Sequence, residues 1–220
     1  MSVEARPAAL RVVIVGAGGQ GKIVADILRA TKPLGTMFAV GFVDDGPWPN
    51  GATVMDLPVL GSVAALPGID HDGVVVALGD NAVRAAVSLA LDARGERVVT
   101  VQHPSAIVSA DVELGPGCMI SAGAVITPCV RIGRGVLVNT NASIDHDSIV
   151  GDFAHIGPGA VSGGRVAIGA RALVGLGASV MSGCRVGDDA VVGAGAVVTR
   201  DVADGSVVVG VPARPIRRQG

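Results

Sequence analysis

The sequence predicts two domains of different fold: a small α/β half-domain over residues 1–104 and a parallel β-helix over residues 105–220. Short apolar strands alternate with helical segments up to about residue 102, whereas from Val108 onwards an aliphatic residue recurs at every sixth position. Aromatic residues make up only 2% of the chain and there are 33 glycines. The core must therefore be built from Val, Ile, Leu and Ala between tight turns.

The first half reads as strands that alternate with helices. We expect strands over Leu10–Val15, Phe38–Val43, Gly73–Leu78 and Arg97–Val101, and helices over Lys22–Thr31 and Asn81–Arg94. Such alternation is typical of a small Rossmann-like parallel sheet with helical crossovers.

A glycine-rich turn joins the first strand to the first helix. Gly16, Gly18 and Gly21 match the pattern G-x-G-x-x-G, and Asp44 or Asp45 follows the second strand near the distance expected of a ribose contact. Such a turn offers backbone amides to phosphate at a helix N-terminus. The pattern alone would suggest NAD. Because the half-domain is short and no dehydrogenase catalytic domain follows, we favour the diphosphate of a nucleotide sugar.

The six-residue period defines the second half. Of the sixteen positions from Val108 to Val198, fifteen are aliphatic, and the next residue is often Gly. This period is typical of a parallel β-helix, and at three repeats per triangular coil the run predicts roughly five coils. Ser162 is the exception, which predicts either a local bulge or a buried serine bonded to its own backbone.

Polar chemistry gathers between residues 139 and 155. In the six-residue frame Ile144 points inward, so His146 lies at an outward turn, and His155 precedes the inward Ile156 and also faces out. An outward histidine in a repeat is more often a solvated side chain. However, a neutral imidazole with a pKa near about 6.5 can accept the proton of an attacking amine, and Asp147 or Asp145 could orient it.

Composition excludes several classes of function. The net charge is -2 and no Lys/Arg cluster precedes the last few residues, which argues against nucleic acid or an anionic membrane as partner. No stretch approaches the roughly 18 apolar residues of a membrane span, so we expect a cytoplasmic protein. Cys118, Cys129 and Cys184 lack metal-ligand spacing and are expected to be reduced, mostly structural thiols.

Nearly the whole chain resembles the sugar-nucleotide acetyltransferases related to the sialic-acid O-acetyltransferase and the bacillosamine-pathway N-acetyltransferase. The hexapeptides, Gly16–Gly21, Ile144-Asp-His-Asp147 and Val209–Arg214 carry this resemblance. It implies a left-handed β-helix, a homotrimer with active sites between subunits, acetyl-CoA in the groove between adjacent β-helices and a nucleotide sugar on the first domain. It implies no metal.

The resemblance also assigns roles to residues. It implies His146 as general base and Asp147 as its acidic partner, with Asn139 supporting the loop or the substrate. The family often has Glu at the position of Asp147 and commonly His at that of Gln20. The implied nucleotide-sugar contacts are Gly16, Gly18, Gly19, Gln20, Gly21, Asp44, Asp45, Gly79, Asn81 and Arg84. A plain helix cap by Asp80 or Asn81 is the alternative there.

On the coenzyme side, the implied contacts are His155, Gly164, Gly175, Ala194, Pro212, Ala213, Arg214 and Arg217. We predict that a backbone amide of Gly163–Gly164 is the oxyanion donor. A solvated basic terminus is the alternative reading of the tail, Arg217 and Arg218 above all.

The function that the resemblance favours is acetyl transfer from acetyl-CoA to the C4 amino group of a nucleotide-linked 4-amino-4,6-dideoxy sugar. GDP-perosamine is the favoured substrate, and UDP- or dTDP-linked sugars come next. O-acetylation of a sialic acid is the nearest alternative, and a non-catalytic sugar-nucleotide-binding trimer is a remote one. A zinc lyase of the carbonic anhydrase type needs three histidine ligands, and the repeat region holds only His146 and His155.

Overall fold

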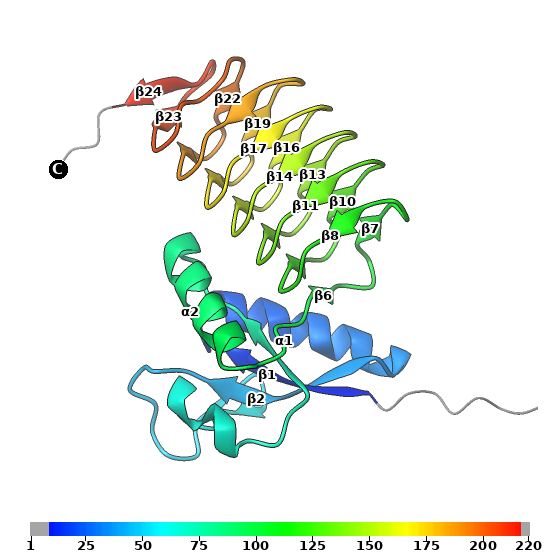
Figure 1. Cartoon of the computed structure of the whole chain (residues 1–220), viewed down its shortest axis with the longest axis vertical. Helices are drawn as coiled ribbons and strands as arrows, with labels where there is room; N and C mark the ends of the chain where they lie inside the picture. The colour runs from blue at the N-terminus through cyan, green and yellow to red at the C-terminus, as the bar shows by residue number, and fades with distance from the viewer. Residues whose placement is uncertain (1–8, 217–220) are drawn as a thin grey trace, which may run out of the picture.

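The structure, a computed structural model, describes residues 9–216 and contains the two predicted folds (Figure 1). The first domain is built on a parallel sheet of β1 (Leu10–Val15), β2 (Met37–Val43) and β5 (Gly73–Val76) in the order β2-β1-β5, with helices α1 (Gly19–Thr31) and α2 (Asn81–Ala93). The middle of β1 is fully buried, as expected of a parallel strand covered on both faces. The predicted α/β half-domain is confirmed.

Smaller elements fill the connections of this domain, and the sequence did not predict them. They are the 3₁₀ helices η1 (Lys32–Leu34) and η2 (Val63–Gly68) and the hairpin of β3 (Thr53–Val54) with β4 (Leu57–Pro58). The predicted strand over Arg97–Val101 is wrong as a single element. Val98 makes only an isolated bridge to Val74, whereas β6 (Val101–Gln102) pairs with the β-helix strand β9.

The β-helix follows the predicted period without interruption, since each of its two-residue strands β7 to β22 ends on a predicted inward position. These strands are β7 (Ile107–Val108), β8 (Glu113–Leu114), β9 (Met119–Ile120), β10 (Val125–Ile126), β11 (Arg131–Ile132), β12 (Leu137–Val138), β13 (Ser143–Ile144), β14 (Ile149–Val150), β15 (His155–Ile156), β16 (Val161–Ser162), β17 (Ala167–Ile168), β18 (Leu173–Val174), β19 (Ser179–Val180), β20 (Arg185–Val186), β21 (Val191–Val192) and β22 (Val197–Val198). The described residues end with the antiparallel pair β23 (Val207–Val209) and β24 (Arg214–Ile216).

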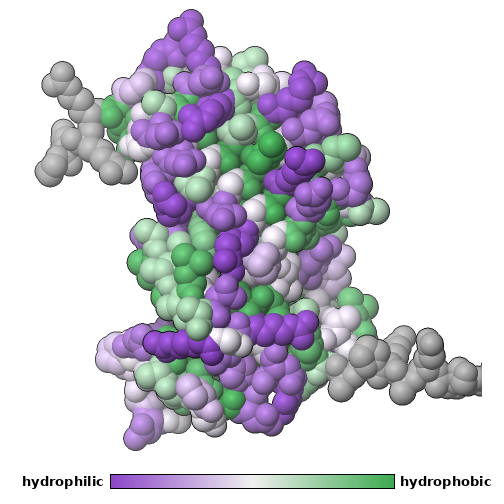
Figure 2. Space-filling model, viewed as in Figure 1, coloured by the Kyte–Doolittle hydropathy of each residue, from purple (hydrophilic) through white to green (hydrophobic). Residues whose placement is uncertain are grey.

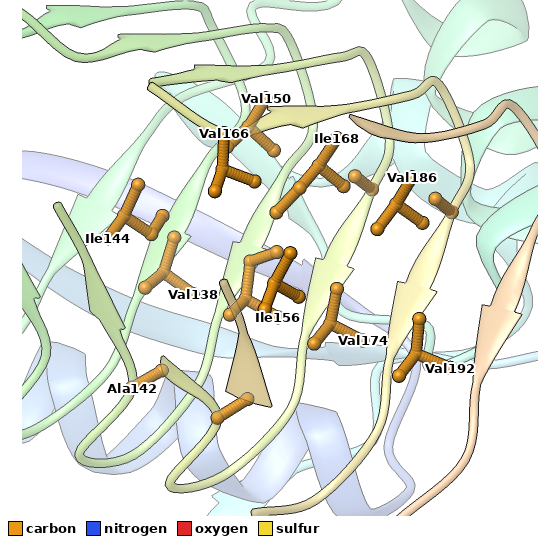
Figure 3. Packing of buried hydrophobic residues seen from close by; sticks show 14 of the residues in the cluster. Val138, Ala142, Ile144, Val150, Ile156, Val166, Ile168, Val174, Val186 and Val192 are labelled. Carbon is orange, nitrogen blue, oxygen red and sulfur yellow. The ribbon is translucent and has the colours of Figure 1, made fainter. Parts of the chain in front are cut away.

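The inward side chains form one continuous aliphatic column. Figure 3 shows Ile144, Ile156 and Ile168 among the side chains that point toward one another inside the coils. Burying each aliphatic side chain contributes about 1.5–3 kcal/mol. Ser162 stays in register with Ile144 and Val180, so the alternative of a bulge is wrong, and the position remains buried.

Each strand pairs in parallel with the strand three places later, which gives the β-helix three faces. We call β6, β9, β12, β15, β18, β21 and β23 the covered face, β7, β10, β13, β16, β19 and β22 the neutral face, and β8, β11, β14, β17 and β20 the charged face. The seven parallel strands of the covered face delimit six coils, one more than the sequence predicted. The extra coil comes from β6 and β23, which lie outside the counted repeats.

The first domain packs on the covered face. In Figure 1, α1 lies between the three-stranded sheet and the β-helix, and α2 stands beside it. One hydrophobic cluster joins Ile27 and Leu28 of α1 to Met119 and Leu137 of the β-helix. On the surface shown in Figure 2, apolar side chains of the β-helix lie between polar margins. The contact between the two domains therefore rests on a shared core.

Candidate active site

His146 lies at the edge of the β-helix where the neutral face meets the charged face, between β13 and β14. Its side chain is about half exposed, at 48%, and its Nδ1 lies 2.8 Å from Oδ2 of Asp147. When the carboxylate accepts from Nδ1–H, the tautomer leaves Nε2 without a proton and able to accept one. The geometry supplies an oriented base on an accessible edge.

The two neighbouring aspartates have different partners. Oδ1 of Asp145 accepts hydrogen bonds from the backbone amide of His146 at 2.8 Å and from Oγ1 of Thr127 at 3.1 Å. The hydrogen bond from that amide lowers the pKa of Asp145 below its usual value; burial acts in the opposite direction, and the hydrogen bond from Thr127 lowers the pKa further. Asp145 therefore shapes the turn, while Asp147 is the partner of the ring.

The turn one coil further along is closed against the imidazole. A Cβ added at Gly164 would lie 2.6 Å from both Cε1 and Nε2 of His146, which is much closer than non-bonded atoms approach. Only glycine leaves room for the ring in this position. The Gly163 amide donates to the Val180 carbonyl, whereas the Gly164 amide donates to no acceptor within residues 9–216. Of the two predicted oxyanion donors, Gly164 is therefore the one whose amide is free to bind a ligand.

His155 faces outward as predicted, but the first domain covers it. Asn139 is buried and its Nδ2 donates to Nε2 of His155 at 3.2 Å. Burial, together with the nearby charge of Arg84, lowers the pKa of His155 to about 4 although the Gly79 carbonyl acts in the other direction. His155 is therefore partly buried, but a ligand can still reach it, because it lines a cavity of about 250 Å³ with Gly79 and Asn81.

Arg84 and Asn81 join the two domains. Arg84 is fully buried and donates to the carbonyls of Gly135 at 2.9 Å and Phe153 at 2.6 Å. Asn81 donates to the Arg171 carbonyl at 2.8 Å and accepts from Arg84. The prediction that Arg84 contacts the nucleotide is therefore wrong, because its side chain is sealed in the interface. The cap of α2 is Asp80, whose carboxylate accepts from the Val83 amide.

The glycine loop lies at the carboxyl end of β1, where open α/β sheets bind ligands. Gly16 has a φ of 102°, which favours glycine, and the Gly21 Cα packs against the Gly16 carbonyl so closely that no side chain would fit. By contrast, a Cβ at Gly18 or Gly19 would meet nothing within 4 Å. The start of α1 is thus open to a ligand, and Gln20 lies beside Gly79.

Asp44 and Asp45 follow β2 at the same edge of the sheet. Asp44 accepts from the amides of Ala17 and Gly46 and from Nε1 of Trp48, each at 2.8 Å. Partial burial acts to raise the pKa of Asp44, but these hydrogen bonds hold it below its usual value. Asp44 therefore braces the loops, whereas Asp45 is exposed and uses Oδ1 to accept from Val63.

Trp48 is a residue that the sequence reasoning missed. It lines a cavity of about 420 Å³ with Asp44, Asp45 and Asn50. The sequence held two signals for it: Trp48 is the only tryptophan of the chain, and it lies three residues after Asp45.

Three of the predicted coenzyme contacts occupy the two edges that flank the neutral face, whereas His155 belongs to β15 on the covered face. Gly175 and Ala194 lie on successive coils at the edge between the covered and neutral faces, and Gly164 lies at the other edge. Pro212, Ala213 and Arg214 belong to the terminal hairpin, where the Ala213 amide donates to the Val197 carbonyl. Arg214 is exposed. Arg217 lies outside the described residues.

In a triangular coil each edge lies opposite one face. The edge that carries His146 lies opposite the covered face, where the first domain sits. Within one chain, the candidate base and the glycine loop of the first domain are therefore on opposite sides of the β-helix.

Within residues 9–216, no group of three or more His, Cys, Asp or Glu side chains could hold a metal ion. None of the helices described is both long and apolar enough to cross a bilayer.

Comparison with protein families gives two matches along the chain. Residues 11–91 match the PglD N-terminal domain, and residues 106–128 and 165–200 match the hexapeptide repeat of succinyl-transferase. A GDP-perosamine N-acetyltransferase of Escherichia coli O157:H7 is 32% identical over 145 residues. This match spans 64% of the chain and 64% of the length of that relative.

Solved structures match over almost the whole length. PerB from Caulobacter crescentus, in complex with CoA and GDP-perosamine, is 38% identical with a TM-score of 0.87, and the match covers 97% of this chain and 100% of that one. The acetyltransferase domain of PglB from Neisseria gonorrhoeae, in complex with acetyl coenzyme A, is 34% identical with a TM-score of 0.87 over 95% of this chain and 100% of that one. The chain belongs to the sugar-nucleotide acetyltransferase family of left-handed β-helix, hexapeptide-repeat proteins.

Proposed function

We propose that the protein transfers an acetyl group from acetyl-CoA to the C4 amino group of a nucleotide-linked 4-amino-4,6-dideoxy sugar, with GDP-perosamine as the favoured substrate. The observation that carries the proposal is His146, whose Nδ1 faces Asp147 while its Nε2 packs over Gly164 on an open edge. The relatives named above, two of them with CoA or acetyl-CoA bound, support the donor and the acceptor.

The chemistry is a direct attack. The amine forms a C–N bond to the thioester carbon, Nε2 of His146 accepts the ammonium proton, and Asp147 stabilises the imidazolium. The negative charge on the carbonyl oxygen is met by the Gly164 amide, a kind of donor that lowers the barrier by roughly 3 kcal/mol. The C–S bond then breaks, and the coenzyme A thiolate takes the proton back from His146.

The order of the strands supports one proposed direction of the nucleotide sugar across the first domain. The glycine loop after β1 takes the diphosphate at the start of α1, which is a favourable place for an anion. Since β2 and β5 lie on opposite sides of β1, the nucleoside extends toward Asp45 and the amino sugar toward Gly79. The sugar then enters the cavity that His155 and Asn81 line.

We propose that each active site is shared between subunits of a homotrimer. A sugar bound over the covered face of one chain lies on the side away from the His146 of that chain, so a second copy must supply the base. The outward side chains of the neutral face carry no charge, and they are Ile107, Val125, Ser143, Val161, Ser179 and Val197. This face is suited to pack against a neighbour. The proposal places the enzyme in the cytoplasm.

Release of the coenzyme A thiol tests the proposal directly. Acetyl-CoA is incubated with GDP-perosamine and with UDP- and dTDP-linked 4-amino sugars, for the wild type and for His146→Asn. We expect turnover with GDP-perosamine, and a fall in kcat of about 100- to 10,000-fold in the variant, as is usual on loss of a general base. No turnover with any amino sugar, or full activity in His146→Asn, would overturn the proposal; turnover only with hydroxyl acceptors would replace it by O-acetylation.

A further inference from the structure

Two buried hydroxyls interrupt the apolar interior of the β-helix, and both lie beside the candidate base. The inward positions are the sixth-residue series and the residue two places before each. From Ala106 to Val198 they are filled by Ala, Val, Ile, Leu and Cys, and only Ser148 and Ser162 carry a hydroxyl. Both serines are buried, Ser148 completely. A buried hydroxyl costs free energy unless it is hydrogen-bonded, so its partners indicate what it does.

Ser148 bridges the two ends of the turn that packs over the candidate base. Its Oγ donates to the Gly163 carbonyl at 3.4 Å and accepts from the Val166 amide at 3.1 Å. In the turn one coil further on at the same edge, the Cys184 amide donates directly to the Met181 carbonyl. The hydroxyl of Ser148 therefore stands between two groups that bond directly in the next coil.

This bridge acts on the proposed oxyanion donor. The Gly163 carbonyl and the Gly164 amide belong to the same planar peptide unit, so a hydrogen bond to the carbonyl fixes the direction of the N–H. The same bond polarises the peptide unit, because linked hydrogen bonds strengthen one another. Ser148 can therefore influence the reacting carbonyl oxygen through one peptide group, without touching the substrate.

Ser162 acts on the turn that carries His146. The Asp145 amide donates to Oγ of Ser162 at 3.4 Å, so this hydroxyl bonds the backbone of the previous coil. The equivalent amides one coil before and after, those of Thr127 and Gly163, donate to backbone carbonyls of the next coil. A side chain has therefore become the acceptor at the position directly before the base.

We propose that Ser148 and Ser162 are positioning residues of the acetyl transfer, which hold the Gly164 amide and the His146 ring in one fixed arrangement. The two turns are stacked, and the Arg165 amide donates to the His146 carbonyl at 2.8 Å. Each serine belongs to one of these coils and holds the turn of the other. The inference rests on the proposed function, because base and oxyanion donor must fit the same tetrahedral intermediate.

Two variants of nearly equal shape test the hydroxyl of Ser148 alone. Val130 and Val166 fill the equivalent buried positions one coil before and after, so Ser148→Thr and Ser148→Val should both fit the coil. In the thiol-release assay we expect Ser148→Thr, which keeps the hydroxyl, to retain most of the kcat. Ser148→Val should lower kcat about 10- to 100-fold with KM unchanged, because a displaced donor is felt in the transition state. Equal kcat values for the two variants would overturn the proposal.

The same comparison applies at Ser162, whose neighbours in the column are Ile144 and Val180. Ser162→Val should lower kcat about 10-fold, whereas Ser162→Thr should not. Cys184→Ala removes a buried sulfur at the same edge of the β-helix and is the control, with the kinetics of the wild type expected. A loss in Cys184→Ala as large as that in Ser148→Val would assign the effect to packing and overturn the proposal.

Crystal structures of the two Ser148 variants test the bridge without any turnover. In Ser148→Val we expect the Val166 amide to donate directly to the Gly163 carbonyl, with the Gly163–Gly164 peptide rotated relative to Ser148→Thr. The same peptide orientation in both variants would overturn the proposal, even if the enzyme acetylates GDP-perosamine. A rotated peptide together with a wild type that acetylates no amino sugar would contradict the proposed function, and with it the role in catalysis, but not the bridge.

Discussion

His146 and His155 both face outward from the same β-helix, yet their surroundings are opposite. His146 is half exposed beside a carboxylate, whereas His155 lies beneath the first domain next to a buried arginine that helps to lower its pKa to about 4. The repeat sets only the direction of each side chain. What covers that side chain decides whether the imidazole can exchange a proton at neutral pH.

This difference assigns the histidines different tasks. His146 has the geometry of a base. The pKa of His155 is lowered to about 4 by burial and by the nearby charge of Arg84, and Asn139 holds its Nε2, so this ring is suited to neutral hydrogen bonding and not to the work of a base. The predictions below alter one side of this comparison at a time.

The largest expected effect comes from removing what covers His155. Arg84→Met leaves the carbonyls of Gly135 and Phe153 without their donor, and we expect a loss of about 3–5 kcal/mol in the free energy of unfolding, measured with urea. Leu89→Ala, at an exposed position of the same helix, should change it by less than about 1 kcal/mol. A small effect of Arg84→Met would mean that the two domains do not depend on this residue.

The next effect concerns the position of His146. In Gly164→Ala the added methyl overlaps the imidazole, and a ring displaced by about 1 Å can lower kcat about 100-fold. The protein should remain as stable as the wild type, and Gly68→Ala, where the added methyl meets nothing within 4 Å, should keep full activity. An active Gly164→Ala would show that the tight contact is not needed to orient the base.

The partly buried His155 should affect stability at acid pH. The pKa of His155 is about 4 in the folded chain and about 6.5 in the unfolded chain. Its contribution is complete above pH about 6.5 and is lost as the pH falls toward about 4, because only the unfolded chain binds the proton in that window. After allowance for partial exposure, we expect a loss of roughly 2 kcal/mol. Urea unfolding should show that His155→Gln reduces this slope; an unchanged slope would place the titration elsewhere.

The smallest effect tests whether an arginine must be buried to stabilise the contact between the domains, or whether an ion pair alone is enough. Arg134 donates to Asp92 of α2 at 2.9 Å, with both side chains partly exposed. Arg134→Ala should cost less than about 1 kcal/mol, since exposed ion pairs contribute little. If it destabilises the chain as much as Arg84→Met in urea unfolding, the contrast between the exposed and the buried arginine is wrong.

The sequence predicts some parts of this molecule better than others. The β-helix positions were predictable because a fixed period places every inward residue, and β1 and both helices were predictable from local patterns. The packing of the first domain over His155 was not predictable, because it depends on hydrogen bonds from Arg84 and Asn81 to carbonyls far away in the chain. Trp48 was missed for a similar reason: its place depends on the Asp44 carboxylate that joins two loops.

Mixing two inactive variants tests most directly the central claim that the base and the sugar site come from different chains. His146→Asn removes the base, and Gly18→Glu puts a carboxylate into the proposed diphosphate site, at a position where an added Cβ meets nothing within 4 Å. After the two variants are unfolded and refolded together, random trimers should recover about one quarter of the wild-type rate of thiol release, since that fraction of sites has both halves intact. No recovery, with each variant trimeric and folded, would contradict the account and place the whole active site in one chain.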